Sequence, residues 1–273
     1  MTGRYPNGHL LIEVDEAERI ATAPGAILLD ARAQGYESGH IPGALPIDVK
    51  QLKDGTKPDF AGPGRIGLIL KQCGVSDKSD VVVYDDGAGT LAARVFYVLE
   101  AHGLIDRVKL LNGGYTAWVA AGKPVSADTP EIVPGSASAA LDSARVVAKG
   151  ELQAGLERMT VLDVRTLAEY AGDDLRSNRK GGHIRGAVHK EWKEALAPID
   201  GQGVVRFKPY DALKREYEAA GVFADRTIVP YCQGNQRGAH TYFVLRLLGY
   251  PDVRPYEGSW EEWGNAEDTE VER

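Results

Sequence analysis

The chain has 273 residues, of which 43% are hydrophobic and 26% charged, and its formal net charge is −7. This length suits two domains of about 130 residues each. A negative chain without a basic run argues against nucleic-acid binding, and no continuous apolar stretch reaches the roughly 18 residues of a membrane span. With no signal-peptide-like start and only two cysteines, we expect a reducing, cytoplasmic location.

In the first half, short apolar runs alternate with stretches of helical period. We expect strands at Ala26–Asp30, Val81–Tyr84 and Val108–Leu111, and helices at Ile66–Cys73 and Leu91–His102. The segment Gly62–Gly67 formally fits a dinucleotide-binding glycine pattern, but no strand precedes it, so it indicates a turn that begins a helix.

A proline-rich and small-residue stretch, Gly122–Ser138, separates the halves. Its composition predicts an extended connector rather than a packed element. We therefore expect a first domain at 1–125, a linker at 126–143 and a second domain at 144–273.

The second half repeats the alternation of strand and helix. Strands are expected at Val161–Val164, Thr227–Tyr231 and Val253–Tyr256, and helices at Tyr210–Ala220, Gly238–Leu248 and Ser259–Gly264. This order predicts an α/β protein with mainly parallel sheets, whose chemistry lies at the carboxyl ends of the strands. The acidic end, Glu261–Arg273, is expected to be solvated and frayed.

The two halves carry the same four segments in the same order, which indicates an internal repeat. The second copy has about ten extra residues between Arg165 and Gly182, in a polar stretch that predicts a loop insertion. The matched segments are Asp30–Arg32 with Asp163–Arg165, Gly39–Ala44 with Gly182–Ala187, Tyr84–Gly87 with Tyr231–Gly234, and Asn112–Trp118 with Glu257–Trp263.

Cys232 is the candidate nucleophile, because it stands between a predicted strand and a predicted helix. Free amides and the positive dipole end of a helix favour a thiolate there, and Arg237 adds positive charge. The loop residues Gln233, Gly234, Asn235, Gln236 and Arg237 are the candidate binding residues. In the alternative interpretation, Arg237 pairs with an acid such as Glu169 and leaves binding to the backbone amides.

The first half has the same turn without the thiol. Asp85 occupies the position of Cys232, and we expect Ala88, Gly89 and Thr90 to replace Asn235, Gln236 and Arg237. Only the second copy is therefore expected to be catalytic. Cys73 follows a predicted helix and is expected to serve packing.

Other recurring residues are expected to be structural, because the silent copy has them too. These are the Asp–Arg pairs at two strand ends and the repeat-equivalent His40 and His183, which we expect to hold a turn. The six histidines show no spacing typical of a metal site. Trp260 and Trp263 are expected in the core.

Two long motifs carry a family resemblance. Residues 36–47, with Tyr36, His40 and Ala44, match the amino-terminal motif of the tandem rhodanese family except for Tyr in place of the usual Phe. Residues 253–263 match its carboxyl-terminal motif. The chain thus resembles the thiosulfate and 3-mercaptopyruvate sulfurtransferases over nearly its whole length, and its active loop resembles bacterial members with Cys-Gln-x-x-x-Arg.

The resemblance implies two tandem rhodanese-like domains, each a mainly parallel sheet flanked by helices, with a site in the cleft between them. It implies an enzyme that moves sulfane sulfur from thiosulfate or a related donor to cyanide or a thiol through a persulfide on Cys232. The partners would be a small sulfur donor and a thiophilic acceptor, which can be a thiol protein, and no cofactor or metal is implied. The sequence departs from the family in lacking a basic pair, with Gln233 and Gly234 after the cysteine and Glu169 at a usually basic position.

Three alternatives stay open at this point. The chain could be a 3-mercaptopyruvate sulfurtransferase, a persulfide carrier to a partner protein, or a cysteine phosphatase. Four residues separate Cys232 from Arg237, one fewer than in the phosphatase loop, which disfavours the phosphatase.

Overall fold

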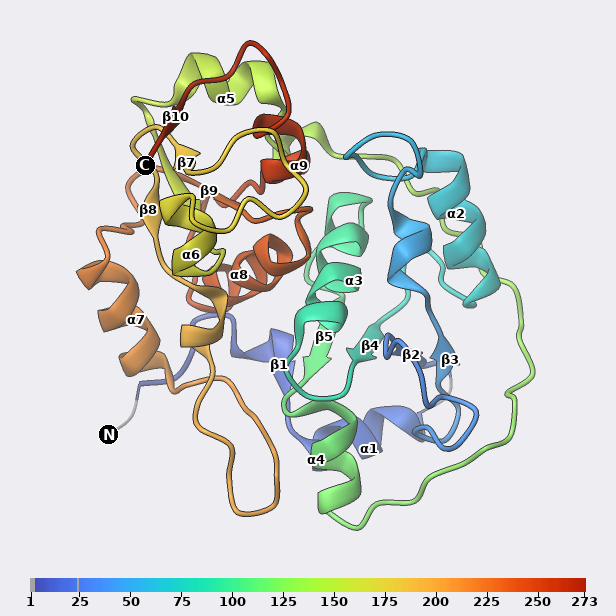
Figure 1. Cartoon of the computed structure of the whole chain (residues 1–273). Helices are drawn as coiled ribbons and strands as arrows, with labels where there is room; N and C mark the ends of the chain where they lie inside the picture. Colours follow the sequence, from blue (N-terminus) through green and yellow to red (C-terminus); the bar gives the residue numbers. More distant parts are fainter. Residues whose placement is uncertain (1–2, 24) are drawn as a thin grey trace.

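Two parallel sheets, one in each half, organise the computed structural model, which describes residues 3–23 and 25–273. Figure 1 shows the halves as two lobes, with helices α3 and α8 side by side where the lobes meet. The predicted α/β class with parallel sheets is confirmed.

The first sheet has the strand order β1-β5-β4-β2-β3, with every neighbouring pair parallel. All four residues of β4 are buried, as a run of Val-Val-Val-Tyr predicts for the centre of a sheet covered on both faces. The strands expected from sequence in this half occur within one residue of their predicted bounds. The five strands of this sheet, of which β1 and β3 were not predicted, are β1 Leu11–Ile12, β2 Ile27–Asp30, β3 Leu45–Pro46, β4 Val81–Tyr84 and β5 Val108–Leu111.

The helices of the first half cover both faces of this sheet (Figure 1). Helix α2 begins at Pro63 after Gly62, so the glycine-rich segment is the turn into a helix, as expected. Helix α3 is buried along most of its length because it also packs against the second half. The helical segments are η1 Gly8–Leu10, α1 Val14–Ala21, η2 Val49–Leu52, α2 Pro63–Gln72, α3 Thr90–Ala101 and α4 Gly114–Ala120.

The second sheet has the order β8-β6-β9, with β6 at Met159–Asp163, β8 at Val188–His189 and β9 at Thr227–Tyr231. The strand predicted at Val253–Tyr256 is wrong as a regular strand. Val253 bridges Ile228 and Tyr256 bridges Val147, but no continuous ladder forms. Pro230 and Pro255 explain the interruption, since proline has no N–H to donate to a ladder.

The remaining elements of the second half surround this sheet. Helix α8 begins two residues earlier than predicted, so Gln236 and Arg237 lie in its first turn. The predicted fraying of the acidic end is wrong, because β10 pairs antiparallel with β7 and anchors it. These elements are η3 Ser143–Arg145, α5 Lys149–Gly155, α6 Leu167–Ala171, β7 His183–Ile184, η4 Trp192–Ala195, α7 Tyr210–Ala219, α8 Gln236–Leu247, α9 Ser259–Trp263 and β10 Val271–Glu272.

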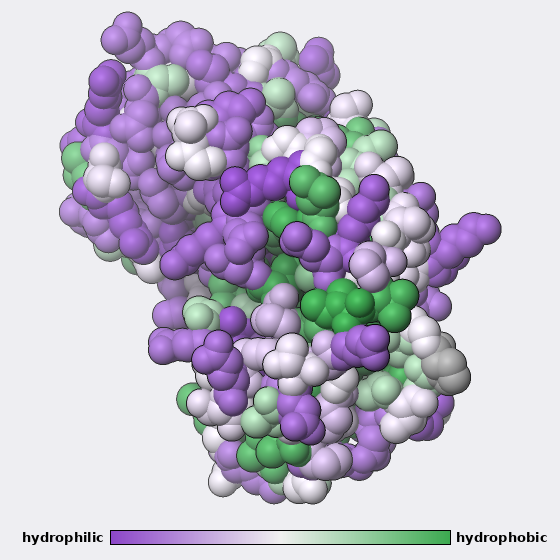
Figure 2. Space-filling view, turned by 90° about the vertical axis from the view of Figure 1, so that its right-hand side faces the viewer, coloured by the Kyte–Doolittle hydropathy of each residue, from purple (hydrophilic) through white to green (hydrophobic). Residues whose placement is uncertain are grey.

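The connector between the halves has no helix or strand from residue 127 to residue 142, but part of it is packed. Gly135 N–H donates to Lys71 O and Ala137 N–H to Val75 O, and both Ala137 and Ala139 are buried. The expectation of an unpacked connector is therefore wrong: its small residues lie close against the end of α2. Figure 2 shows the molecule from the side of α2 and the connector, where apolar side chains gather.

Helices α3 and α8 form the apolar centre of the contact between the halves. Phe96 packs edge to face on Phe243, and Tyr97 on Tyr242. Arg246 of α8 also forms a buried ion pair with Glu100 of α3 at 3.0 Å. Among the described residues, no helix is both long and apolar enough to cross a membrane.

Candidate active site

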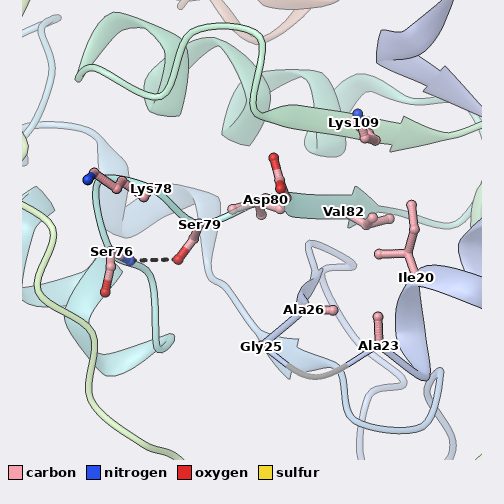
Figure 3. Close-up of a pocket in the computed structure, with 11 residues that line it drawn as sticks. Ile20, Ala23, Gly25, Ala26, Ser76, Lys78, Ser79, Asp80, Val82 and Lys109 are labelled. Carbon is pink, nitrogen blue, oxygen red and sulfur yellow. Dashed lines mark hydrogen bonds between the residues drawn. The ribbon is translucent and has the colours of Figure 1, made fainter.

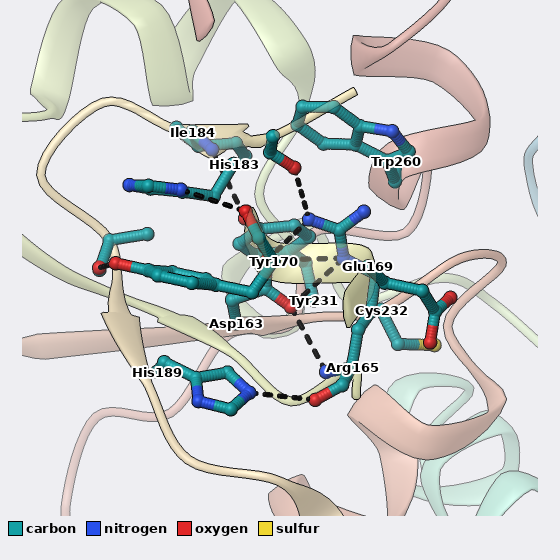
Figure 4. Close-up of polar contacts among 12 residues, drawn as sticks. Asp163, Arg165, Glu169, Tyr170, His183, Ile184, His189, Tyr231, Cys232 and Trp260 are labelled. Atoms are coloured by element: carbon teal, nitrogen blue, oxygen red, sulfur yellow. Dashed lines mark hydrogen bonds and ion pairs between the residues drawn. The ribbon is translucent and has the colours of Figure 1, made fainter. Parts of the chain in front are cut away.

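The predicted Asp–Arg pairs are confirmed as buried ion pairs at strand ends, and Figure 4 shows the pair of the second half, Asp163 and Arg165. Arg165 donates to both carboxylate oxygens of Asp163 and, through Nη2, to Gly182 O at 2.7 Å. Arg32 and Asp30 repeat these contacts in the first half. Because the pair occurs in both copies, it supports the fold of each sheet edge.

The repeat-equivalent histidines hold turns, as expected. Nδ1 of His183 lies 3.1 Å from Tyr170 O, and the His183 ring stacks on that tyrosine. His40 and Tyr36 make the same arrangement in the first half.

Cys232 follows the last residue of β9 and precedes α8, as the sequence predicts. Its backbone is fixed by two contacts with the segment that begins α9: Cys232 N–H donates to Ser259 Oγ, and Cys232 O accepts from Trp260 N–H at 2.9 Å. Only 1% of the residue is exposed, so its thiol lies at the bottom of the site.

The loop after Cys232 leads into the amino terminus of α8 with backbone amides that are unbonded in the part of the chain that the structure describes. Within the described residues, the N–H groups from Gly234 to Gly238 have no hydrogen-bond acceptor. Free amides at a helix amino terminus stabilise an anion. The loop can therefore cradle a thiolate or a persulfide.

The first half displays such a cradle with an anion already in it. The carboxylate of Asp85 accepts hydrogen bonds from the N–H groups of Gly87, Gly89, Leu91 and Ala92 at 2.9 to 3.2 Å. One correction applies to the predicted correspondence. Five residues separate Tyr84 from the start of α3 and four separate Tyr231 from the start of α8, so Thr90 corresponds to Gln236.

Arg237 forms a bidentate ion pair with Glu169, at 2.7 and 2.9 Å, as the alternative interpretation held. Burial would lower the pKa of Arg237, but Glu169 and nearby Cys232 outweigh it and raise the pKa. Burial alone would raise the pKa of Glu169, but Arg237 and Thr166 lower it to about 2. Glu169 thus stays ionised, neutralises much of the Arg237 charge, and also lies 3.3 Å from Arg176.

A cavity of about 520 Å³ holds Cys232 and lies between the two halves. Lys53 of the first half donates to Gly234 O at 3.2 Å and so reaches the cysteine loop. A Cβ at position 234 would lie 2.8 Å from Lys53 Nζ, so a larger residue there would displace the end of the Lys53 side chain. The lining residues are Val49, Lys50, Lys53, Thr90, Arg94, Arg176, Trp192, Cys232, Gln233, Gly234, Gln236 and Arg237.

The cavity includes all but one of the predicted site residues. Gln233 lines it and exchanges two hydrogen bonds of 3.0 Å with Asn178 of the insertion loop. Asn235 does not line it. Its side chain is fully buried and donates to Glu257 at 2.6 Å.

Sequence analysis missed four cationic residues of this cavity: Lys50, Lys53, Arg94 and Arg176. Three come from the first half, and Arg176 comes from the predicted insertion loop. A signal did exist for Arg176, since the insertion has no counterpart in the silent copy. For the other three, no local pattern indicates that they face the second half.

A second cavity, of about 540 Å³, lies at the amino ends of β2 and β4 (Figure 3). Ser76 N–H donates there to Ser79 Oγ at 2.9 Å and closes a turn. This is the edge of the sheet opposite to the one where parallel α/β sheets place their chemistry. Cys73 lies elsewhere and is buried, and burial raises the pKa of its thiol to about 11, as suits a packing role.

Comparison with known structures shows the same fold in proteins of distant sequence. An anaerobic ergothioneine biosynthesis enzyme from Chlorobium limicola, in complex with trimethyl histidine, aligns with a TM-score of 0.85. The identity is 23%, over 99% of this chain and 71% of that one.

Comparison with known sequences gives closer relatives. A thiosulfate sulfurtransferase from Azotobacter vinelandii is 35% identical, over 96% of this chain and 97% of its own. The sulfur carrier protein TtuD from Thermus thermophilus is 32% identical, over 96% and 95%. The rhodanese-like domain model matches twice, at residues 13–121 and 148–266, and the chain therefore belongs to the rhodanese family.

Proposed function

We propose that this chain is a thiosulfate sulfurtransferase that carries sulfane sulfur as a persulfide on Cys232. The observation that supports this most is the charge of the cavity. Five of its lining residues are cationic and none is acidic, in a chain whose net charge is −7. Such a cavity attracts a small anion such as thiosulfate and directs it to the cysteine.

The transfer takes two steps on the same sulfur atom. The Cys232 thiolate attacks the outer sulfur of thiosulfate, a new S–S bond forms, and sulfite leaves with the electron pair of the bond that breaks. Cyanide or a thiolate then attacks the outer persulfide sulfur, and Cys232 departs as a thiolate. The free amides after Gly234 stabilise the anion in both resting forms.

Because Cys232 is buried, a donor must enter the cavity to reach its thiol, whereas an acceptor needs to reach only the outer sulfur of the persulfide. A persulfide extends the side chain by an S–S bond of about 2 Å, which brings the transferable sulfur nearer the mouth than the buried thiol. The acceptor can then be cyanide, a small thiol or a thiol on a protein. The last is supported by the relative named as a sulfur carrier protein. We place this chemistry in the cytoplasm, where thiols persist.

Steady-state turnover with different donors distinguishes a thiosulfate sulfurtransferase from a sulfur carrier, a 3-mercaptopyruvate sulfurtransferase and a phosphatase. A pure carrier takes up sulfur but turns over slowly with small acceptors, and a 3-mercaptopyruvate enzyme prefers that donor. Steady-state rates with thiosulfate, 3-mercaptopyruvate and an aryl phosphate, each measured on the purified chain, rank the proposals. A preference for the phosphate would contradict the sulfurtransferase assignment.

The first prediction concerns the cysteine. Incubation with thiosulfate adds one sulfur atom to the chain, measured by intact mass, and cyanide removes it. Cys232→Ser abolishes both the adduct and turnover, because an alcohol of much higher pKa does not replace a thiolate. Cys73→Ser is the matched control, with near-normal turnover expected. An adduct that survives in Cys232→Ser and disappears in Cys73→Ser would refute the assignment.

A further inference from the structure

One buried hydrogen-bond network joins the first half to the cysteine loop. Arg94 of α3 donates from Nη1 and Nη2 to the two carboxylate oxygens of Glu257, at 2.8 and 2.5 Å. Glu257 Oε2 also accepts from Asn235 Nδ2 at 2.6 Å. The side chains of Arg94 and Glu257 are 2% and 4% exposed, and Asn235 is fully buried.

Asn235 is the residue through which this network acts on the loop. It precedes α8 with φ of +57°, the left-handed conformation that few residues other than glycine and asparagine adopt readily. Its side chain is held only at its amide nitrogen, since Oδ1 has no partner among the described residues. The bond to Glu257 therefore fixes the orientation of the residue that turns the cysteine loop into the helix.

Among the described residues, no matching network joins the second half to the Asp85 loop of the first half. Arg94 and His240 are each the fifth residue of their helix, Gly89 and Asn235 each precede the helix in a left-handed conformation, and Asn112 corresponds to Glu257. His240 is buried, and burial lowers its pKa to about 3, so it is neutral where Arg94 is charged. Asn112 instead contacts Phe207 and Glu13.

This asymmetry separates the network from the structural pairs. Asp163 and Arg165 have the equivalents Asp30 and Arg32 in the first half. Arg94, Glu257 and Asn235 have no residue of the same type at their equivalent positions in the other half. A buried ion pair adds little net stability relative to a well-packed apolar pair, because both charges lose their hydration. A charged pair that occurs only beside the cysteine loop thus indicates a role in that loop.

We propose that Arg94 and Glu257 are positioning residues that hold the Cys232 loop in its reactive shape through Asn235. This inference rests on the proposed sulfur transfer at Cys232. It gives the first half a specific part in the chemistry beyond forming one wall of the cleft. Arg94 also lines the cavity, so its charge adds to the field around the cysteine.

The second prediction tests this network with two variants. Asn235→Gly keeps the left-handed turn, as Gly89 does in the first half, but removes the link to Glu257. Arg94→Met removes the charge at similar volume. We expect kcat for thiosulfate and the rate of Cys232 alkylation at fixed pH to fall together by about tenfold or more, because small misplacements of reacting groups are costly. The double variant should lose little more than the worse single one.

The matched control is Arg246→Met. Arg246 of α8 forms an ion pair with Glu100 of α3, also across the contact between the halves, and within the described residues it has no contact with the cysteine loop. We expect a lower Tm with alkylation and kcat near those of the original chain. If Asn235→Gly and Arg94→Met lower only Tm, as this control does, the proposal is overturned. If Arg94→Met does not fold, the result for Asn235→Gly alone decides whether the proposal holds. Alkylation needs no sulfur donor, so it tests loop positioning even if thiosulfate is not a substrate.

Discussion

The ion pair between Arg237 and Glu169 changes the role expected of Arg237 in donor binding. From the sequence, Arg237 is the only cation of the cysteine loop and the expected binder of an anionic donor. In the fold, both of its terminal nitrogens are engaged by Glu169, which is itself only 1% exposed. Lys50, Lys53 and Arg176 add positive charge to the cavity wall, with Arg176 also 3.3 Å from Glu169 and Lys53 3.4 Å from Glu261. Arg237 retains an influence on Cys232 through proximity.

The third prediction follows from this pairing. Glu169→Gln keeps the shape of the side chain but removes its charge, so Arg237 and Arg176 become more available to an anion. We expect KM for thiosulfate to fall several-fold with a smaller change in kcat. Arg237→Ala should raise KM for thiosulfate and slow Cys232 alkylation, and Arg237→Lys should recover only part, because an ammonium lacks the planar fork.

These variants need a stability measurement beside the kinetics. Arg237→Ala leaves the buried Glu169 carboxylate with Arg176 as its only ion-pair partner among residues 3–23 and 25–273, so a lower Tm is expected. The double variant with Glu169→Gln removes that unpaired charge. If Arg237→Ala leaves both KM and the alkylation rate unchanged in that background, Arg237 has no part in donor binding.

The two strand-to-helix loops differ in what their backbone amides bind. Both end a buried strand at a tyrosine, and both enter a helix through a left-handed residue. In the first loop, four backbone N–H groups are occupied by the Asp85 carboxylate. In the second, the corresponding amides have no acceptor within the described residues. The silent loop is therefore filled by its own anion.

The fourth prediction concerns Asp85→Cys, made in a chain that also carries Cys232→Ser. We expect no persulfide and no turnover, because Leu91, the second residue of α3, stands where α8 has Arg237, and because the loop is one residue longer. We also expect a lower Tm, since four N–H groups lose a carboxylate acceptor. Intact mass after thiosulfate treatment measures the adduct. A second working site in this variant would show that the loop shape alone is sufficient.

For the whole molecule, the sequence predicted what is local or repeated. Runs rich in β-branched residues placed β4 and β9 correctly, a short apolar run placed β5, and the repeat predicts Cys232, at the position of Asp85, as the nucleophile. The irregular path at Val253 was missed because two prolines on paired segments interrupt the ladder. Lys53 and Arg94 were missed because they act across the cleft, and no periodicity along the chain encodes which faces of two domains meet. Only for Arg176 did a usable signal exist, because its loop has no counterpart in the first half.

The fifth prediction concerns the cationic residues that the first half contributes to the cavity. Lys50 is exposed at the cavity and belongs to the first half, so Lys50→Gln removes one charge that attracts the donor. At low ionic strength we expect KM for thiosulfate to rise about three- to fivefold, the effect of roughly 1 kcal/mol from a surface charge. Added salt screens such charges, so the difference between variant and original should shrink as ionic strength rises.

The matched control for this prediction is Lys57→Gln. Lys57 is 61% exposed in the same half and pairs with Asp59, but it does not line the cavity that holds Cys232. Its loss changes the net charge by the same amount, so KM for thiosulfate should stay near that of the original chain at every salt concentration. Equal effects of the two substitutions would mean that overall charge, rather than the cation-lined wall supplied by the first half, guides the donor. Unequal effects in the expected direction would assign donor capture to the domain that has Asp85 in place of the cysteine.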